Sequence, residues 1–193
     1  NPSGITCDGC GFINADRATL TTGQINLGNS GNIDSYRVTR GSVNILGQGL
    51  NNKQNNYTDI LARAIHINAG IWANKLSAIA GANQIASVQP PSHPDHLAQP
   101  VAIAADPNES KPVFAIDIGL LGNMYAGLGR LIGTEDGLGV RNRGTIAMNQ
   151  GEFTVVSAGI VDNTGRITSA SNLHIQAQGG LINGAPNSIG EKA

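Results

Sequence analysis

The feature that most constrains the fold is a repeat of about 20 residues in the C-terminal part of the chain. The segment Val140–Ile146 aligns with Val161–Ile167 at an offset of 21 residues (140 to 161), and Phe153 aligns with Leu173 at an offset of 20. A degenerate third copy of Asn-Thr-Gly lies near Asn183. Helical-hairpin repeats have longer periods and helical spacing, whereas successive coils of a parallel β-helix fit this period.

Short segments with two-residue periodicity favour the same architecture. Apolar and polar residues alternate in 173–178, 153–157, 43–45 and 65–69, and Gly or Asn follows each segment closely. Such segments are typical of short strands with one buried and one solvated face. In 173–178 the odd positions are expected to face a core. The sequence therefore predicts an all-β chain.

Two regions depart from the simple alternating pattern. The segment 59–79 contains apolar residues that also fit a helical face, but its β-branched residues and the Asn-Ala-Gly at 68–70 favour strands. The segment 89–111 departs from the coil pattern, and proline cannot donate to a central strand ladder. We expect a solvated loop with an attached hairpin there, dispensable for the coil. Five of the eight prolines lie in it: Pro90, Pro91, Pro94, Pro100 and Pro107.

Composition excludes several classes of function. The net charge is −1 and only 13% of residues are charged, which argues against a nucleic-acid partner because such binding needs a basic face. No apolar run reaches the roughly 18–20 residues of a membrane span.

Histidines and carboxylates give no clear metal or catalytic site. His93 and His96 could hold a metal together with Asp95, but their proline-rich setting favours a solvated loop. His66 and His174 occupy polar positions of alternating segments, where exposure is expected. Some β-helices are pectin-degrading enzymes that need clustered carboxylates, and no such set emerges here. We expect no enzyme activity, no metal and no cofactor.

The first residues carry a specific motif. Asn1-Pro2-Ser3-Gly4-Ile5-Thr6-Cys7-Asp8-Gly9-Cys10-Gly11-Phe12-Ile13-Asn14 closely resembles the NPNGI-x-C-x-x-C-x-F-IN segment of two-partner secretion exoproteins. This family includes filamentous haemagglutinin-type adhesins, haemolysins and contact-dependent growth inhibition toxins. Further segments resemble the same secretion domain: Ala18–Gly23, Gly47–Leu50, Leu61–Ala64, Asn68–Ala69, Met124–Gly127, Leu131–Glu135 and Gly137–Asn142.

The resemblance implies a right-handed parallel β-helix with the proline-rich loop or hairpin outside the coil. Residues 1–146 are then the secretion domain, truncated at its N-terminus, and residues 147–193 are rungs that continue the same solenoid. The family domain has a further cap before the motif, so we expect the open end to bind an upstream fragment or a second copy of the chain.

The resemblance also implies a function. An outer-membrane β-barrel transporter with periplasmic POTRA domains recognises this domain, and the β-helix then folds at the surface of a Gram-negative cell, after passage through the periplasm. The alternative is an adhesin segment of the β-helix that binds a host or bacterial surface molecule.

Two candidate sites follow from the motif. Asn1, Pro2, Ser3 and Gly4 suit a type I turn, and in the family this turn implies a transporter-recognition element. For Cys7 and Cys10, a zinc site lacks a second ligand pair, and a redox pair lacks the expected helix. A structural disulfide suits a protein exported through an oxidising periplasm.

Overall fold

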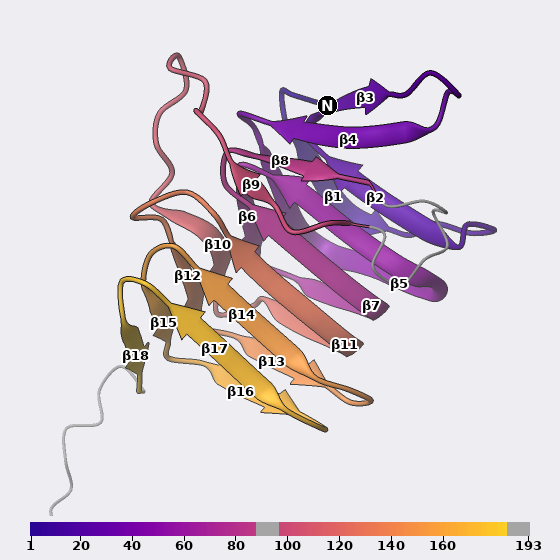
Figure 1. Cartoon of the computed structure of the whole chain (residues 1–193). Helices are drawn as coiled ribbons and strands as arrows, with labels where there is room; N and C mark the ends of the chain where they lie inside the picture. The colour runs from indigo at the N-terminus through magenta and orange to yellow at the C-terminus, as the bar shows by residue number, and fades with distance from the viewer. Residues whose placement is uncertain (88–96, 185–193) are drawn as a thin grey trace, which may run out of the picture.

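The computed structural model describes residues 1–87 and 97–184, and every regular element in these ranges is a β-strand. The strands stack as successive rungs of a solenoid, from the N-terminal indigo end to the C-terminal yellow end (Figure 1). Within the described ranges, no helix is long and apolar enough to span a membrane. The predicted parallel β-helix is confirmed.

Each rung crosses three faces, which we call A, B and C, and strands pair in parallel with their equivalents in the next rung. Face A contains β1 (Ile5–Cys10), the start of β5 (Ser42–Ala62), β6 (Ala64–Ile67), β10 (Phe114–Ile118), β12 (Gly139–Asn142), β15 (Val161–Asn163) and β18 (Leu181–Asn183). Face B contains the middle of β5, the starts of β7 (Gly70–Ala80) and β11 (Asn123–Gly133), β13 (Thr145–Met148) and β16 (Arg166–Ser169). Face C contains β2 (Arg17–Thr21), the ends of β5, β7 and β11, β14 (Phe153–Ser157) and β17 (Leu173–Ala177).

The sequence repeat is the strand register of the last rungs. Val140 pairs with Val161 on face A, and Phe153 pairs with Leu173 on face C, as the alignment of the repeat predicts. The third copy is also in register, because Asn163 pairs with Asn183. A rung of about 20 residues is therefore one full turn of this solenoid.

The core lies inside the coil, where equivalent positions of successive rungs stack. On face C, the register places five apolar residues in one inner column, and all of them are buried. Each pairs with the equivalent residue of a neighbouring rung, so that a rung is stabilised by its neighbours. The column contains Leu20, Ile60, Ala78, Leu131 and Val155.

Two insertions leave the coil after face C and form a separate antiparallel sheet. Residues 22–41 contain β3 (Gln24–Leu27) and β4 (Ile33–Val38), and residues 81–113 contain β8 (Asn83–Ala86) and β9 (Val101–Ala102). The strands pair in the order β3-β4-β8-β9, beside the upper part of the solenoid (Figure 1).

The antiparallel sheet covers the outer side of face C. Leu61, Ile79 and Ile132 point outward from the coil and are buried in a second apolar cluster. The sheet contributes Tyr36, Val38 and Ile85 to this cluster, and Leu97, which forms an isolated bridge with Ser87, belongs to it too. Face C is thus buried on both sides in these rungs, which the sequence pattern did not show.

The structure decides between the alternatives for 59–79. These residues form the end of β5, β6 and most of β7, so the helical alternative is wrong and the strand interpretation is confirmed. Their apolar residues occupy consecutive positions because both sides of face C are covered, and strands buried on both faces lose the alternating pattern.

The predicted departure of the proline-rich segment from the coil is confirmed, and its described residues, 97–111, are exposed or half-buried apart from Leu97. β9 pairs antiparallel with β8, and Leu97, which pairs with Ser87, is only 3% exposed. Backbone amides of Ile103 and Asp106 donate to carbonyls elsewhere in the protein. His93, Asp95, His96 and the first prolines lie outside the described residues.

Candidate functional site

The predicted turn at Asn1–Gly4 is present. The backbone N–H of Gly4 donates to the carbonyl of Asn1 at 3.0 Å, and that of Ser3 donates to Oδ1 of Asn1 at 3.1 Å. Asn1, Pro2 and Ser3 are exposed. The turn lies against the start of β5, where the Pro2 carbonyl occupies the space that a Cβ on Gly41 would fill, at 2.7 Å.

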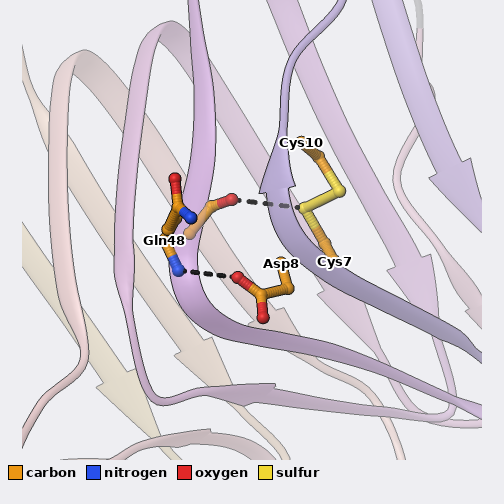
Figure 2. Close-up of a disulfide and its surroundings, with 5 residues drawn as sticks. Cys7, Asp8, Cys10 and Gln48 are labelled. Atoms are coloured by element: carbon orange, nitrogen blue, oxygen red, sulfur yellow. Dashed lines mark hydrogen bonds between the residues drawn. A yellow bond between two sulfur atoms is a disulfide. The ribbon is translucent and has the colours of Figure 1, made fainter.

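Cys7 and Cys10 are joined by a disulfide at the corner where the first rung turns from face A to face B (Figure 2). Cys7 is fully buried, and its Sγ lies 3.5 Å from the carbonyl oxygen of Gly49. Cys10 pairs with Leu50, past a register shift at which the single residue Gly9 is opposite residues 47–49 of β5. The disulfide therefore closes a small loop that packs directly on the next rung.

A second contact fixes the same corner. Oδ1 of Asp8 accepts a hydrogen bond of 2.8 Å from the backbone N–H of Gln48 (Figure 2). The Asp8 carboxylate occupies the space where a side chain at Gly47 would lie. Two motif segments that are far apart in the sequence, Cys7–Cys10 and Gly47–Leu50, thus form one contact surface.

Arg63 links three further segments. Its Nε and Nη2 donate to the two carboxylate oxygens of Glu135 at 3.2 and 3.0 Å, and Nη1 donates to Oε2 of Glu109 at 3.3 Å. Glu109 also accepts from the backbone N–H of Gly41 at 3.0 Å. Arg63 is only 3% exposed, and hydrogen bonding to Glu135 raises its pKa above the ordinary value. This cluster fastens the proline-rich insertion to the coil.

Glu135 is held ionised by the same contacts. Burial acts to raise the pKa of its carboxyl, but the hydrogen bonds and charge of Arg63 outweigh burial and lower that pKa. The backbone N–H of Ala82 also donates to Oε2 of Glu135, at 3.3 Å. This hydrogen bond connects Glu135, which follows β11 on face C, to the start of the insertion at 81–113.

Arg141 belongs to another motif segment and has a comparable role on face A. It donates two hydrogen bonds to Asp117 in the preceding rung, at 2.9 and 2.7 Å, and its guanidinium lies 4.3 Å from the ring centre of Phe114. Hydrogen bonding to Asp117 raises the pKa of Arg141. The motif charges therefore connect rungs, and they do not gather into a catalytic group.

The two histidines in the described part of the chain lie on different faces. His66 is half-buried on face A and His174 is exposed on face C. Among residues 1–87 and 97–184, no group of three or more His, Cys, Asp or Glu side chains could hold a metal ion.

Sequence reasoning missed the cluster around Arg63 and the buried side chain of Leu97. A charged residue within the apolar run Ile60–Ile67 was the available signal, because an arginine buried in such a run requires a carboxylate partner. The sequence did not indicate that Arg63 binds Glu109, because Glu109 lies in an insertion that does not follow the coil repeat.

Comparisons with known proteins agree with the motif. The sequence model of the TPS secretion domain matches residues 1–179. A protein named Toxin CdiA from Yersinia pestis is 44% identical over 95% of this chain. The 16S rRNA endonuclease CdiA from Enterobacter cloacae is 41% identical over 89% of it. The matched part is 5% of the length of each relative, so the activities in their names belong to much larger proteins.

A solved structure supports the same assignment. The crystal structure of a filamentous hemagglutinin secretion domain superposes with a TM-score of 0.71 at 26% identity, covering 96% of this chain and 65% of the other. The family match, the relatives and the superposition extend over the rungs and insertions described above. The chain therefore belongs to the TPS secretion-domain family.

Proposed function

We propose that this domain is the part of a large secreted exoprotein that an outer-membrane β-barrel transporter recognises through its periplasmic POTRA domains. The family match over residues 1–179 is the observation that supports this most strongly. Transport through the periplasm then delivers the chain to the surface of a Gram-negative cell. We propose no catalytic role for the domain itself.

We further propose that Asn1–Gly4 forms part of the recognised surface. The turn is exposed, its shape is fixed by two local hydrogen bonds, and its residues begin the family motif. A fixed exposed turn can be bound with little loss of conformational entropy, which favours specific recognition.

The domain is also proposed to start the folding of the β-helix outside the cell. Each rung buries apolar residues only against its neighbours, so the first assembled rungs provide the surface on which later rungs pack. The rungs of β12–β14 and β15–β17 repeat this packing in register.

An export assay tests the recognition proposal. The full-length exoprotein is expressed with its transporter, and Asn1 and Pro2 are both replaced by alanine. The matched control replaces Asn29 and Ser30, exposed residues of the β3–β4 turn. We expect export to fall for the Asn1/Pro2 variant only. The thermal stability of the domain should be unchanged in both variants. Normal export of the Asn1/Pro2 variant would contradict the proposal.

The first rung is the proposed site of a further association. Within the described residues β1 and β2 each pair with β5 on one side only, which leaves strand edges that another strand can extend. We propose that an upstream fragment or a second copy covers them. Sedimentation at several concentrations, with and without that fragment, tests this; a monomer that ignores the fragment would contradict it.

A further inference from the structure

Two aromatic side chains lie next to each other on the outer side of face B. Trp72 of β7 and Tyr125 of β11 are partners in the strand register. Their ring centres are 6.3 Å apart and their planes differ by 20°. Tyr125 is 39% exposed and Trp72 is half-buried. The sequence pattern did not predict that these two rings are neighbours.

The indole of Trp72 lies flat on the sheet. A Cβ built on Gly70 would be closest to Cη2 of Trp72 and would lie 2.7 Å from both Cζ2 and Cζ3. Such nearly equal distances require a ring that turns its face to Gly70, because a ring edge would bring Cη2 much closer than its neighbours. One face of the indole thus covers the glycine, and the other points away from the sheet. The nearly parallel ring of Tyr125 extends this surface.

A hollow of about 420 Å³ has both Trp72 and Tyr125 in its lining. Its polar lining consists mainly of amide side chains, with one ammonium group and no carboxylate. Asn74 is fixed by hydrogen bonds of 2.8 and 2.9 Å from its Nδ2 to the carbonyls of Lys53 and Asn55. The polar residues that line the hollow are Lys53, Asn74, Asn149 and Gln150.

We propose that this hollow binds a pyranose ring of a glycan, stacked on Trp72 and Tyr125. The C–H groups of a sugar carry slight positive charge and pack on the negative face of an aromatic ring. Amide side chains both donate and accept hydrogen bonds, as the hydroxyl groups of a sugar require. Asn149 and Gln150 at the next rung are placed to bind those hydroxyls.

Other ligand classes fit less well. Protein metal sites usually include carboxylate, imidazole or thiolate ligands, and the lining has none of these. Nucleic acid needs several cationic groups for its phosphates, and Lys53 is alone in this lining. The site is argued independently of the proposed role in export, because its lining contains no residue of the Asn1–Gly4 turn.

The experiment uses the fluorescence of Trp72, which is the sole tryptophan of the chain and therefore reports on this hollow alone. The purified domain is titrated with maltohexaose, chitohexaose and a hexamer of galacturonic acid. We expect a saturable change with at least one of them, with a millimolar Kd. Tyr125→Ala should weaken that binding by about tenfold through the loss of stacking area. Val113→Ala, at an 82% exposed position outside the hollow, should leave the Kd unchanged.

A second variant separates binding from a purely structural role of the rings. Asn149→Ala with Gln150→Ala leaves both rings in place and should weaken binding while the thermal unfolding temperature stays the same. If the three saccharides leave Trp72 fluorescence unchanged, or if the amide double variant binds as well as the wild type, the proposal is wrong. If the Lys53→Met variant binds the galacturonic acid hexamer more weakly than the wild type does, the ligand is an acidic glycan. If the two bind it equally, the ligand is a neutral glycan.

Discussion

The side-chain Nδ2 of Asn142 donates a hydrogen bond of 2.7 Å to Oδ1 of Asn163, which occupies the same position one rung later. Asn163 in turn donates to Oδ1 of Asn183 at 2.7 Å. Asn142 is 3% exposed and Asn163 is 8% exposed. This ladder satisfies amide groups that burial would otherwise leave without partners. It also explains why the asparagine is the clearest element of the sequence repeat.

We predict that Asn163→Ala destabilises the domain by about 1–3 kcal/mol, because it removes the middle of the ladder and leaves the buried amide of Asn142 with only its longer hydrogen bond, 3.4 Å to the carbonyl of Arg166. Asn32→Ala is the control, since Asn32 is exposed and its side chain binds only Ser30 among the hydrogen bonds described. Urea unfolding of both variants measures the difference. Equal stability of the two variants would mean that the ladder contributes little.

The contact between Arg63 and Glu135 predicts a dependence of stability on pH. The folded-state pKa of Glu135 is lowered, so its contribution is present above the unfolded pKa of about 4.3 and is lost as pH falls through the folded value. At neutral pH, Glu135→Gln should cost about 3 kcal/mol, the lower end for breaking a buried pair, because Glu109 still binds Arg63. The difference between wild type and variant should shrink below pH 4. Urea unfolding at pH 7 and pH 3 checks this, and a constant difference would contradict it.

A comparison of alanine substitutions at two glycines distinguishes the cost of a left-handed backbone from the cost of a steric overlap. Gly31 and Gly49 have similar positive φ angles of 79° and 76°. A Cβ at Gly31 would meet nothing within 4 Å, whereas one at Gly49 would overlap the carbonyl oxygen of Gly70. Gly31→Ala should therefore cost only the left-handed backbone penalty of about 1–2 kcal/mol. Gly49→Ala should cost clearly more, or prevent folding, as measured by thermal unfolding; similar unfolding temperatures would be inconsistent with the packing argument.

Leu97 is expected to anchor the second insertion. Leu97→Ala should destabilise the domain by about 2–4 kcal/mol, because it opens a cavity in the cluster with Ile79 and Ile132. Val101→Ala, at a 65% exposed position of β9, is the matched control and should cost little. Guanidinium unfolding compares them. A loss of stability at Val101 equal to that at Leu97 would show that the cluster is not the anchor.

We predict that Cys7 and Cys10 are bonded in the exported protein. Under native conditions a thiol reagent should label neither cysteine until the protein is reduced. Replacing both by serine should cost roughly 2 kcal/mol by chain entropy, since the loop between them is short. Two thiols that react freely in the native secreted protein would contradict the prediction.

The sequence predicted those elements whose pattern has one buried and one solvated side. Phe153, Val155 and Ser157 are buried and alternate with half-buried residues, as expected for a strand with one face in the core. Leu61 and Ile79 could not be placed from the pattern, because the covering sheet arises from insertions at distant positions. Arg63 was similarly ambiguous, since its partner Glu109 lies 46 residues away in an irregular segment.

The candidate site was predictable in its local geometry and only there. Asn1–Gly4 has the residue preferences of a turn, and local hydrogen bonds suffice to form it. The contact of Asp8 with Gln48 depends on the register between rungs, which no local preference determines. The pairing of Trp72 with Tyr125 depends on the same register across an insertion of irregular length.

The antiparallel sheet also sets an order of events for a chain that emerges with its N-terminus first. Ser35 of β4 pairs with Ala86 of β8, 51 residues later in the sequence, whereas Ser42 of the second rung pairs with Ala64 of the third rung at a separation of only 22. Contacts of high sequence separation form slowly, so the coil can close its second and third rungs before the sheet exists. Until β8 arrives, Tyr36 and Val38 lack part of the cluster that buries them. The cluster thus gains Ile85 when β8 pairs with β4, and it is completed only when Leu97 and Ile132 follow, the latter on β11, whose Tyr125 pairs with Trp72 across 53 residues.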